Sequence, residues 1–194
     1  MYNAGCTYPR AMAVLTLVMV EIIDSFPLLL PTGEVVKSEK ALLTDVEDGT
    51  LMQSADSVRF IVIHCSATRE DRDYSEQQLL RDHRARKFRT VGYHFYIRRS
   101  GHVIQCRRLM EVGAHCRPVN RCSIGICYEG GLDSKGNPKD TRTDAQREQL
   151  QLLLIKLHRL FPHASILGHR EAPGATPKAC PCFPSHEYHW IEGI

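Results

Sequence analysis

The run Val58-Arg59-Phe60-Ile61-Val62-Ile63 leads directly into His64-Cys65-Ser66-Ala67-Thr68. The first six residues are mostly apolar and rich in β-branched side chains, which predicts a buried strand. A polar ring at the end of such a strand needs a partner, because buried polar groups are almost always bonded. His64 is therefore either a ligand or a satisfied core histidine, and the strand before it belongs to a central sheet.

Alternating elements follow this strand along the chain. Ser75 stands three residues before Gln78, a capping-box spacing that predicts a helix running to about Lys87. Thr143 has the same spacing and begins a second predicted helix, which Pro162 ends. The apolar side chains of that helix form one stripe: Leu150, Leu153, Leu154, Leu157 and Phe161. Further strands are predicted at 93–98, 102–105, 123–128 and 165–167. The expected fold class is α/β, a mixed central β-sheet flanked by helices, with functional residues at strand ends.

The first 56 residues differ from the rest of the 194-residue chain. They hold three Lys/Arg against eight Asp/Glu, whereas the remainder holds 22 against 14. Their apolar run at 11–20 is too short to span a membrane. Only Arg10 precedes the run and no Ala-x-Ala site follows, so a signal peptide is the less favoured reading. We predict that residues 1–56 are a disordered tail or sequence upstream of a start at Met52, and that residues 57–194 form a single domain.

The basic charge of the predicted domain favours an anionic polymer as its partner, either nucleic acid, a lipid surface or a cell wall. No interleaving of aromatic and basic residues supports nucleic acid.

The eight cysteines do not have the spacing of a disulfide framework. Cys65 and Cys127 lie in apolar strand-like runs, where a thiol behaves as a small hydrophobe. A mostly reduced protein is expected, with a Cys116–Cys122 bridge as the alternative on export.

Three side chains that are far apart in sequence have the chemistry of a metal site. His64 ends one strand, His169 follows another in Gly168-His169-Arg170-Glu171, and Cys180 lies in Pro177-Lys178-Ala179-Cys180-Pro181. Two histidines and a thiolate are a ligand set that zinc favours, and they leave a fourth position for water. Taken singly, each histidine has the alternative of a core residue and the cysteine that of an inert loop thiol. Cys182 is a second candidate thiol.

Two further residues could act beside such a metal. Lys178 lies two residues before Cys180, so an extended loop presents both side chains to one site, and its charge suits the oxyanion of a tetrahedral intermediate. The alternative is a solvated lysine. Tyr93 could donate a hydrogen bond to the same intermediate, or it is an ordinary strand tyrosine with a wet hydroxyl.

Four segments together resemble one known family, in order, from Ser57 to Phe183. The chain resembles the phage-lysozyme type of zinc N-acetylmuramoyl-L-alanine amidase, a family that includes the peptidoglycan recognition proteins. The segments are Ile63-His64-Cys65-Ser66-Ala67-Thr68, Val91-Gly92-Tyr93-His94-Phe95, Ser123-Ile124-Gly125-Ile126-Cys127 and Pro177-Lys178-Ala179-Cys180-Pro181. The stretch from Glu171 to Lys178 departs from the resemblance because it is longer than in the short phage enzymes.

The resemblance implies a role for each site residue. It implies one Zn²⁺ per chain, with the ligands His64, His169 and Cys180. It implies that Tyr93 and Lys178 are the catalytic pair that assists a zinc-activated water. His115, in Val112-Gly113-Ala114-His115, resembles a groove residue that contacts substrate. Lys178 and the water network are both candidates for carrying the proton to the leaving amine.

The implied reaction is hydrolysis of the amide between N-acetylmuramic acid and L-alanine of the peptidoglycan stem peptide. One alternative is a non-catalytic peptidoglycan recognition module of the same fold, for which loss of the cysteine ligand is the signature. Another is a thiol hydrolase, but Cys65 and His64 are strand neighbours and so point to opposite faces.

We expect a monomer without nucleic-acid partners or stable membrane insertion. It is cytoplasmic until release if it is a phage or prophage lysin, and otherwise periplasmic or secreted.

Overall fold

A computed structural model describes residues 50–194, and the predictions for residues 1–49 lie outside this part of the chain. Its main sheet has five strands in the order β4-β3-β5-β1-β7. β4 is antiparallel to β3, and the other neighbours are parallel. The strands are β1 (Phe60–Cys65), β3 (Phe95–Ile97), β4 (Val103–Gln105), β5 (Ser123–Tyr128) and β7 (Ser165–Gly168). A two-stranded sheet pairs β2 (Thr68–Arg69) with β6 (Gly131–Leu132). The predicted mixed α/β sheet is confirmed.

Both predicted helices form where their capping residues indicate. Ser75 Oγ accepts a hydrogen bond from the Gln78 N–H and begins α2 (Glu76–Ala85). Thr143 and Gln146 make both bonds of a capping box at the start of α3 (Asp144–Leu160). The remaining helical segments are short 3₁₀ turns and one longer C-terminal stretch: η2 (Ala55–Ser57), η3 (Asn120–Cys122), η4 (His169–Glu171) and η5 (Ser185–Gly193). Among residues 50–194, no helix has the length and apolarity needed to cross a membrane.

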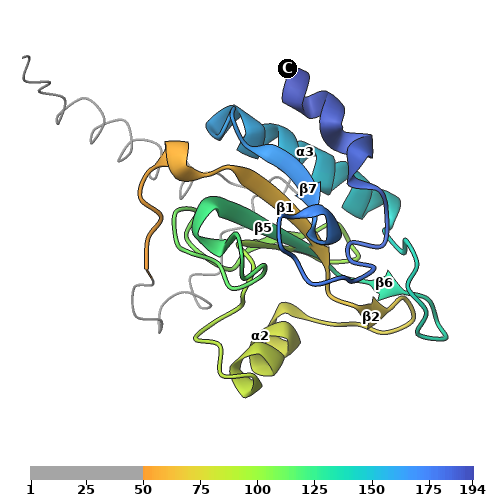
Figure 1. The fold of residues 1–194 in the computed structure, drawn as a ribbon. Coiled ribbons are helices and arrows are strands. Elements are labelled where there is room, and N and C mark those ends of the chain that lie inside the picture. Colours follow the sequence, from red (N-terminus) through yellow and green to blue (C-terminus); the bar gives the residue numbers. More distant parts are fainter. Residues whose placement is uncertain (1–49) are drawn as a thin grey trace, which may run out of the picture.

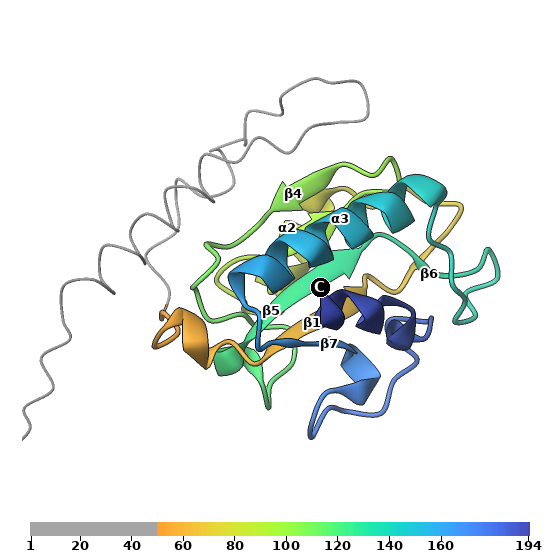
Figure 2. The same cartoon turned by 90° about the horizontal axis from the view of Figure 1, so that it is seen from above.

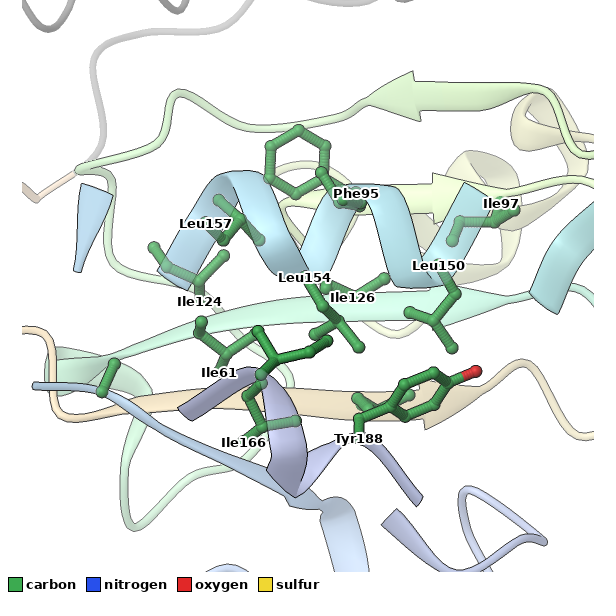
Figure 3. Close-up of a cluster of buried hydrophobic side chains, with 14 of the residues drawn as sticks. Ile61, Phe95, Ile97, Ile124, Ile126, Leu150, Leu154, Leu157, Ile166 and Tyr188 are labelled. Atoms are coloured by element: carbon green, nitrogen blue, oxygen red, sulfur yellow. The ribbon is translucent and has the colours of Figure 1, made fainter. Parts of the chain in front are cut away.

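The larger core lies between the sheet and the helical layer of α3 and η5. α3 and η5 cover one face of the sheet, and α2 lies on the other (Figure 1). Seen from above, α3 runs along the sheet and η5 lies beside it (Figure 2). The apolar stripe of α3, including Leu150, Leu154 and Leu157, packs against isoleucines of β1, β5 and β7 (Figure 3). Leu150 and Leu154 are fully buried, and burial of each such side chain is worth about 1.5–3 kcal/mol.

Alternation along β1 decides which side chains face away from this core. Ile61, Ile63 and Cys65 belong to the cluster under α3, so the intervening His64 points to the face that α2 shares. The predicted placement of His64 and Cys65 on opposite faces is therefore confirmed. On the α2 side, one small cluster includes Leu79 of α2 and Tyr96 of β3.

The described fold begins upstream of residue 57, where the sequence placed the domain boundary. The Met52 N–H donates to Met110 O at 2.7 Å, and the Val112 N–H donates to Thr50 O at 2.8 Å. Leu51 forms an isolated bridge with Glu111, and Met52 is buried. Residues 50–52 therefore pair with the segment that leads to His115.

Candidate metal centre

Parallel pairing of β1 with β7 brings the two predicted histidine ligands together. Ile63 is in register with Gly168, so the next residue of each strand, His64 and His169, extends from the same edge. Their ring centroids lie 5.0 Å apart. Both side chains are buried, with exposed fractions of 2% and 5%.

Cys180 completes the trio from a loop that we call the ligand loop (residues 177–183). Its Sγ lies 3.9 Å from His64 Nδ1 and accepts a hydrogen bond of 3.3 Å from the Cys65 N–H. Cys182 Sγ instead lies 3.8 Å from Cys65 Sγ. Of the two candidate thiols, the structure therefore places Cys180 beside His64.

The donor atoms of this trio fit a zinc ion. His64 Nε2 lies 3.0 Å from His115 Nδ1, which leaves Nδ1 as the free ligand atom of His64. His169 Nδ1 is buried without a hydrogen-bond partner. A nitrogen and a sulfur bound to one tetrahedral zinc stand about 3.6 Å apart, close to the 3.9 Å seen between His64 and Cys180. Within residues 50–194, no three His, Cys, Asp or Glu side chains stand close enough together to hold a cation as they are, so binding of zinc requires them to move closer.

Burial keeps both histidines in the neutral form that binds metals. Desolvation lowers the pKa of His64 well below its usual value, and the charges of His169 and Lys178 add to this effect. Burial and the charge of Lys178 also lower the pKa of His169. At neutral pH each ring therefore offers a lone pair rather than a second proton.

The structure brings both predicted catalytic side chains to the trio. The Tyr93 ring centroid lies 5.1 Å from that of His64. Burial raises the pKa of Tyr93 well above its usual value, so its phenol is a hydrogen-bond donor at neutral pH. Lys178 is exposed, yet its charge reaches both His64 and His169. These positions suit stabilisation of a developing negative charge.

His115, which the resemblance implies to be a groove residue, is the immediate partner of His64 in the structure. Its half-buried ring fits against two glycines: a Cβ on Gly125 would stand 2.5 Å from His115 Cγ, and one on Gly113 would stand 2.4 Å from His115 Cδ2. Asn120 Oδ1 accepts a hydrogen bond of 2.9 Å from the His115 N–H. The glycine inside β5 is the sequence signal that could have indicated this close approach.

Sequence reasoning missed two residues that hold the ligand loop. The buried Tyr128 hydroxyl donates to Pro181 O at 2.6 Å. Arg170 N–H donates to the Cys180 carbonyl at 3.2 Å, and Arg170 Nη2 donates to Phe183 O at 3.0 Å. The sequence identifies Tyr128 only as a strand residue, because its bond is made to a segment 53 positions away.

Tyr128→Phe is expected to weaken zinc binding by about 10-fold, in the range of outer-partner substitutions. The change removes one hydroxyl and leaves the Pro181 carbonyl unpaired, so the ligand loop loses an anchor. Tyr96→Phe is the matched control. The hydroxyl of buried Tyr96 donates to the backbone carbonyl of Tyr74 at 2.7 Å, and this bond does not involve the ligand loop. Chelator competition measures the affinity. Equal zinc affinity in the two variants would contradict the anchoring role.

Comparisons of the sequence and of the fold with known proteins point to the same family. The model of the family described as N-acetylmuramoyl-L-alanine amidase matches residues 54–183. The endolysin of Klebsiella phage KP32 is 39% identical over 123 residues, which cover 63% of this chain and 80% of the relative. The endolysin of Escherichia phage T7 is 38% identical over 128 residues, covering 66% and 83%. Among solved structures, the N-acetylmuramoyl-L-alanine amidase LysC from Clostridium intestinale URNW shares the fold, with a TM-score of 0.61 at 24% identity over 77% of this chain and 95% of that one.

Proposed function

Because the chain belongs to the N-acetylmuramoyl-L-alanine amidase family, we propose that His64, His169 and Cys180 hold a zinc ion at its active centre. The protein is a peptidoglycan amidase of the endolysin type, a hydrolase that degrades cell walls. The bond cleaved joins N-acetylmuramic acid to L-alanine of the stem peptide. The observation that best supports the zinc site is the convergence of two neutral imidazoles and a thiol, with His169 Nδ1 unpartnered.

When bound, a zinc ion would supply Lewis acidity, which would polarise the scissile carbonyl and lower the pKa of water toward neutrality. The side chains around it have separate tasks. The Tyr93 phenol donates a hydrogen bond to the carbonyl oxygen as that oxygen gains negative charge. The ammonium of the exposed Lys178 adds a positive charge near the same carbonyl oxygen. It is also the candidate donor of a proton to the leaving amine.

His115 serves the site in two ways in this proposal. In the 3.0 Å contact between the two rings, His115 Nδ1 accepts a hydrogen bond from the Nε2–H of His64. This bond fixes the tautomer of His64 in which its Nδ1 is free to bind metal. The Nε2 of His115 has no hydrogen-bond partner among the described residues. That nitrogen is buried, so the proposed contact with the muramoyl-peptide is made by the exposed part of the half-buried ring.

Removal of zinc is expected to abolish wall hydrolysis, because neither Tyr93 nor Lys178 replaces zinc in lowering the pKa of the attacking water. The protein is treated with a chelator, its zinc content is measured, and loss of turbidity is followed on purified cell walls. One equivalent of Zn²⁺ should restore activity, and Mg²⁺ should not, since it prefers oxygen ligands. Full hydrolysis by zinc-free protein would sink the zinc proposal. A zinc-loaded protein that binds walls without releasing new L-alanine amino groups would instead be the recognition module.

We also propose that the enzyme works as a monomer on peptidoglycan and reaches the wall from the cytoplasm at lysis, since its relatives include phage endolysins. Fusing residues 1–56 to a reporter that is active only after export tests this route. Export of the reporter would contradict it and favour a periplasmic or secreted enzyme.

A further inference from the structure

Two thiols without a role in the proposed zinc set lie in contact at its edge. Cys65 Sγ and Cys182 Sγ are 3.8 Å apart, although the residues are 117 positions apart in sequence. Cys65 directly follows His64 in β1, and Cys182 lies two residues after Cys180 in the ligand loop. The pair therefore joins the two segments that carry proposed metal ligands.

The backbone around the pair directs the two sulfurs toward each other. Cys182 has a φ of 73°, a left-handed conformation that residues with a side chain rarely adopt. A hydrogen bond of 2.7 Å from its N–H to Ala179 O holds this turn. The turn faces the thiol toward Cys65, while Cys180 Sγ faces His64.

A glycine leaves the room that the sulfurs occupy. A Cβ on Gly131 would stand 2.6 Å from Cys65 Sγ and 3.6 Å from Cys182 Sγ. Gly131 has a φ of 99°, so a larger residue is disfavoured there on two grounds. Cys182 is half-buried, which lets a small reagent reach one of the two sulfurs.

We propose that Cys65 and Cys182 are a disulfide-forming pair, a covalent modification site that ties the ligand loop to the end of β1. The sulfurs need to approach from 3.8 Å to about 2.0 Å. The co-reactant is a low-molecular-weight disulfide such as oxidised glutathione. The Cys182 thiolate attacks it and releases one thiol, and the Cys65 thiolate then attacks the Cys182 sulfur and releases the second. The two protein thiols lose two electrons, the small disulfide gains them, and the two protons end on the released thiols.

The bond is expected to form outside the reducing cytoplasm, because disulfides persist only in oxidising compartments. It closes a long loop of the chain and so restricts the unfolded state. The midpoint of thermal unfolding should rise by about 5–10 °C. For the site itself, which rests on the proposed function, the crosslink keeps His64 and Cys180 adjacent when no metal is bound, so zinc should dissociate several-fold more slowly.

The test incubates the full chain overnight with oxidised glutathione, in zinc-loaded and zinc-free form. A long incubation is needed since Cys65 is buried and Cys182 is half-buried. Free thiols are alkylated, and the digested protein is mapped by mass spectrometry. A Cys65–Cys182 linked peptide with alkylated Cys180 supports the proposal. A Cys65–Cys180 link, or recovery of Cys65 and Cys182 as free thiols, overturns it.

Two variants separate the crosslink from general effects of cysteine removal. Cys182→Ser should lose the oxidative rise in unfolding midpoint and keep the midpoint of the reduced parent. Cys122→Ser, which removes another half-buried thiol, should keep the rise. A rise that persists in Cys182→Ser would contradict the pairing. The linked peptide depends on packing rather than on metal, so a protein that forms it but binds no zinc refutes only the proposed zinc centre.

Discussion

Cys180→Ser is expected to lose bound zinc and to clear cell walls at least about 100-fold more slowly than the parent. The serine hydroxyl is not a zinc ligand at neutral pH, whereas the thiolate is. Changes in outer partners of a metal site already cost about 10–100-fold in affinity or activity, so loss of a ligand should cost more. The Cys180 thiol lies 3.9 Å from His64 Nδ1, the ring nitrogen left free to bind metal. Zinc content and turbidity loss measure the effect.

Cys182→Ser is the matched control, because it makes the same chemical change two residues away. Its sulfur contacts Cys65 Sγ, whereas the sulfur of Cys180 contacts His64, so zinc content and activity should equal those of the parent under reducing conditions. If instead Cys182→Ser loses zinc and Cys180→Ser retains it, the ligand assignment within the loop is wrong.

Lys178→Met is expected to lower kcat by about 100-fold while zinc content stays unchanged. Methionine has a similar length without the charge, so the change removes the electrostatic support of the oxyanion. The charge of Lys178 also contributes to the lowered pKa of both His64 and His169, which is consistent with a position near the proposed centre. Steady-state hydrolysis of a soluble muramoyl-peptide separates kcat from KM.

Lys135→Met provides the comparison, since Lys135 is an exposed lysine in the turn after β6. Its kcat should match the parent within about two-fold, as expected for a surface charge in water. A Lys178→Met enzyme with normal kcat and a raised KM would show that Lys178 binds substrate without acting in the chemical step.

The elements of the fold were largely predictable because their signals are local. The capping residues Ser75 and Thr143 marked both helix starts, and the strand predicted at 123–128 formed at those residues. The strand predicted at 93–98 is shorter and forms at Phe95–Ile97, and the run at 58–63 forms its strand two residues later. η5 was not predicted, since its packing against β7 rather than a strong periodicity places it there.

The candidate site was predictable as a set of residue types and not as an arrangement. Sequence motifs pointed to His64, His169, Cys180, Tyr93 and Lys178, all of which the structure places in one region. They did not reveal that His115 bonds to His64 or that Tyr128 anchors the ligand loop. Both contacts are made by single polar atoms that are distant in the chain, so they leave no spacing pattern.

The sequence by itself determined the apolar strands, the capped helices and the ligand types, because periodicity and capping act over a few residues. Only the tertiary structure decided that β1 pairs with β7 and that Cys180, rather than Cys182, faces His64 across 116 positions of chain. Parallel strands are joined by long crossovers, so their register depends on packing of the whole core. The direction of each loop thiol depends on the backbone turn at Cys182 and on the room left by Gly131, which no local pattern specifies.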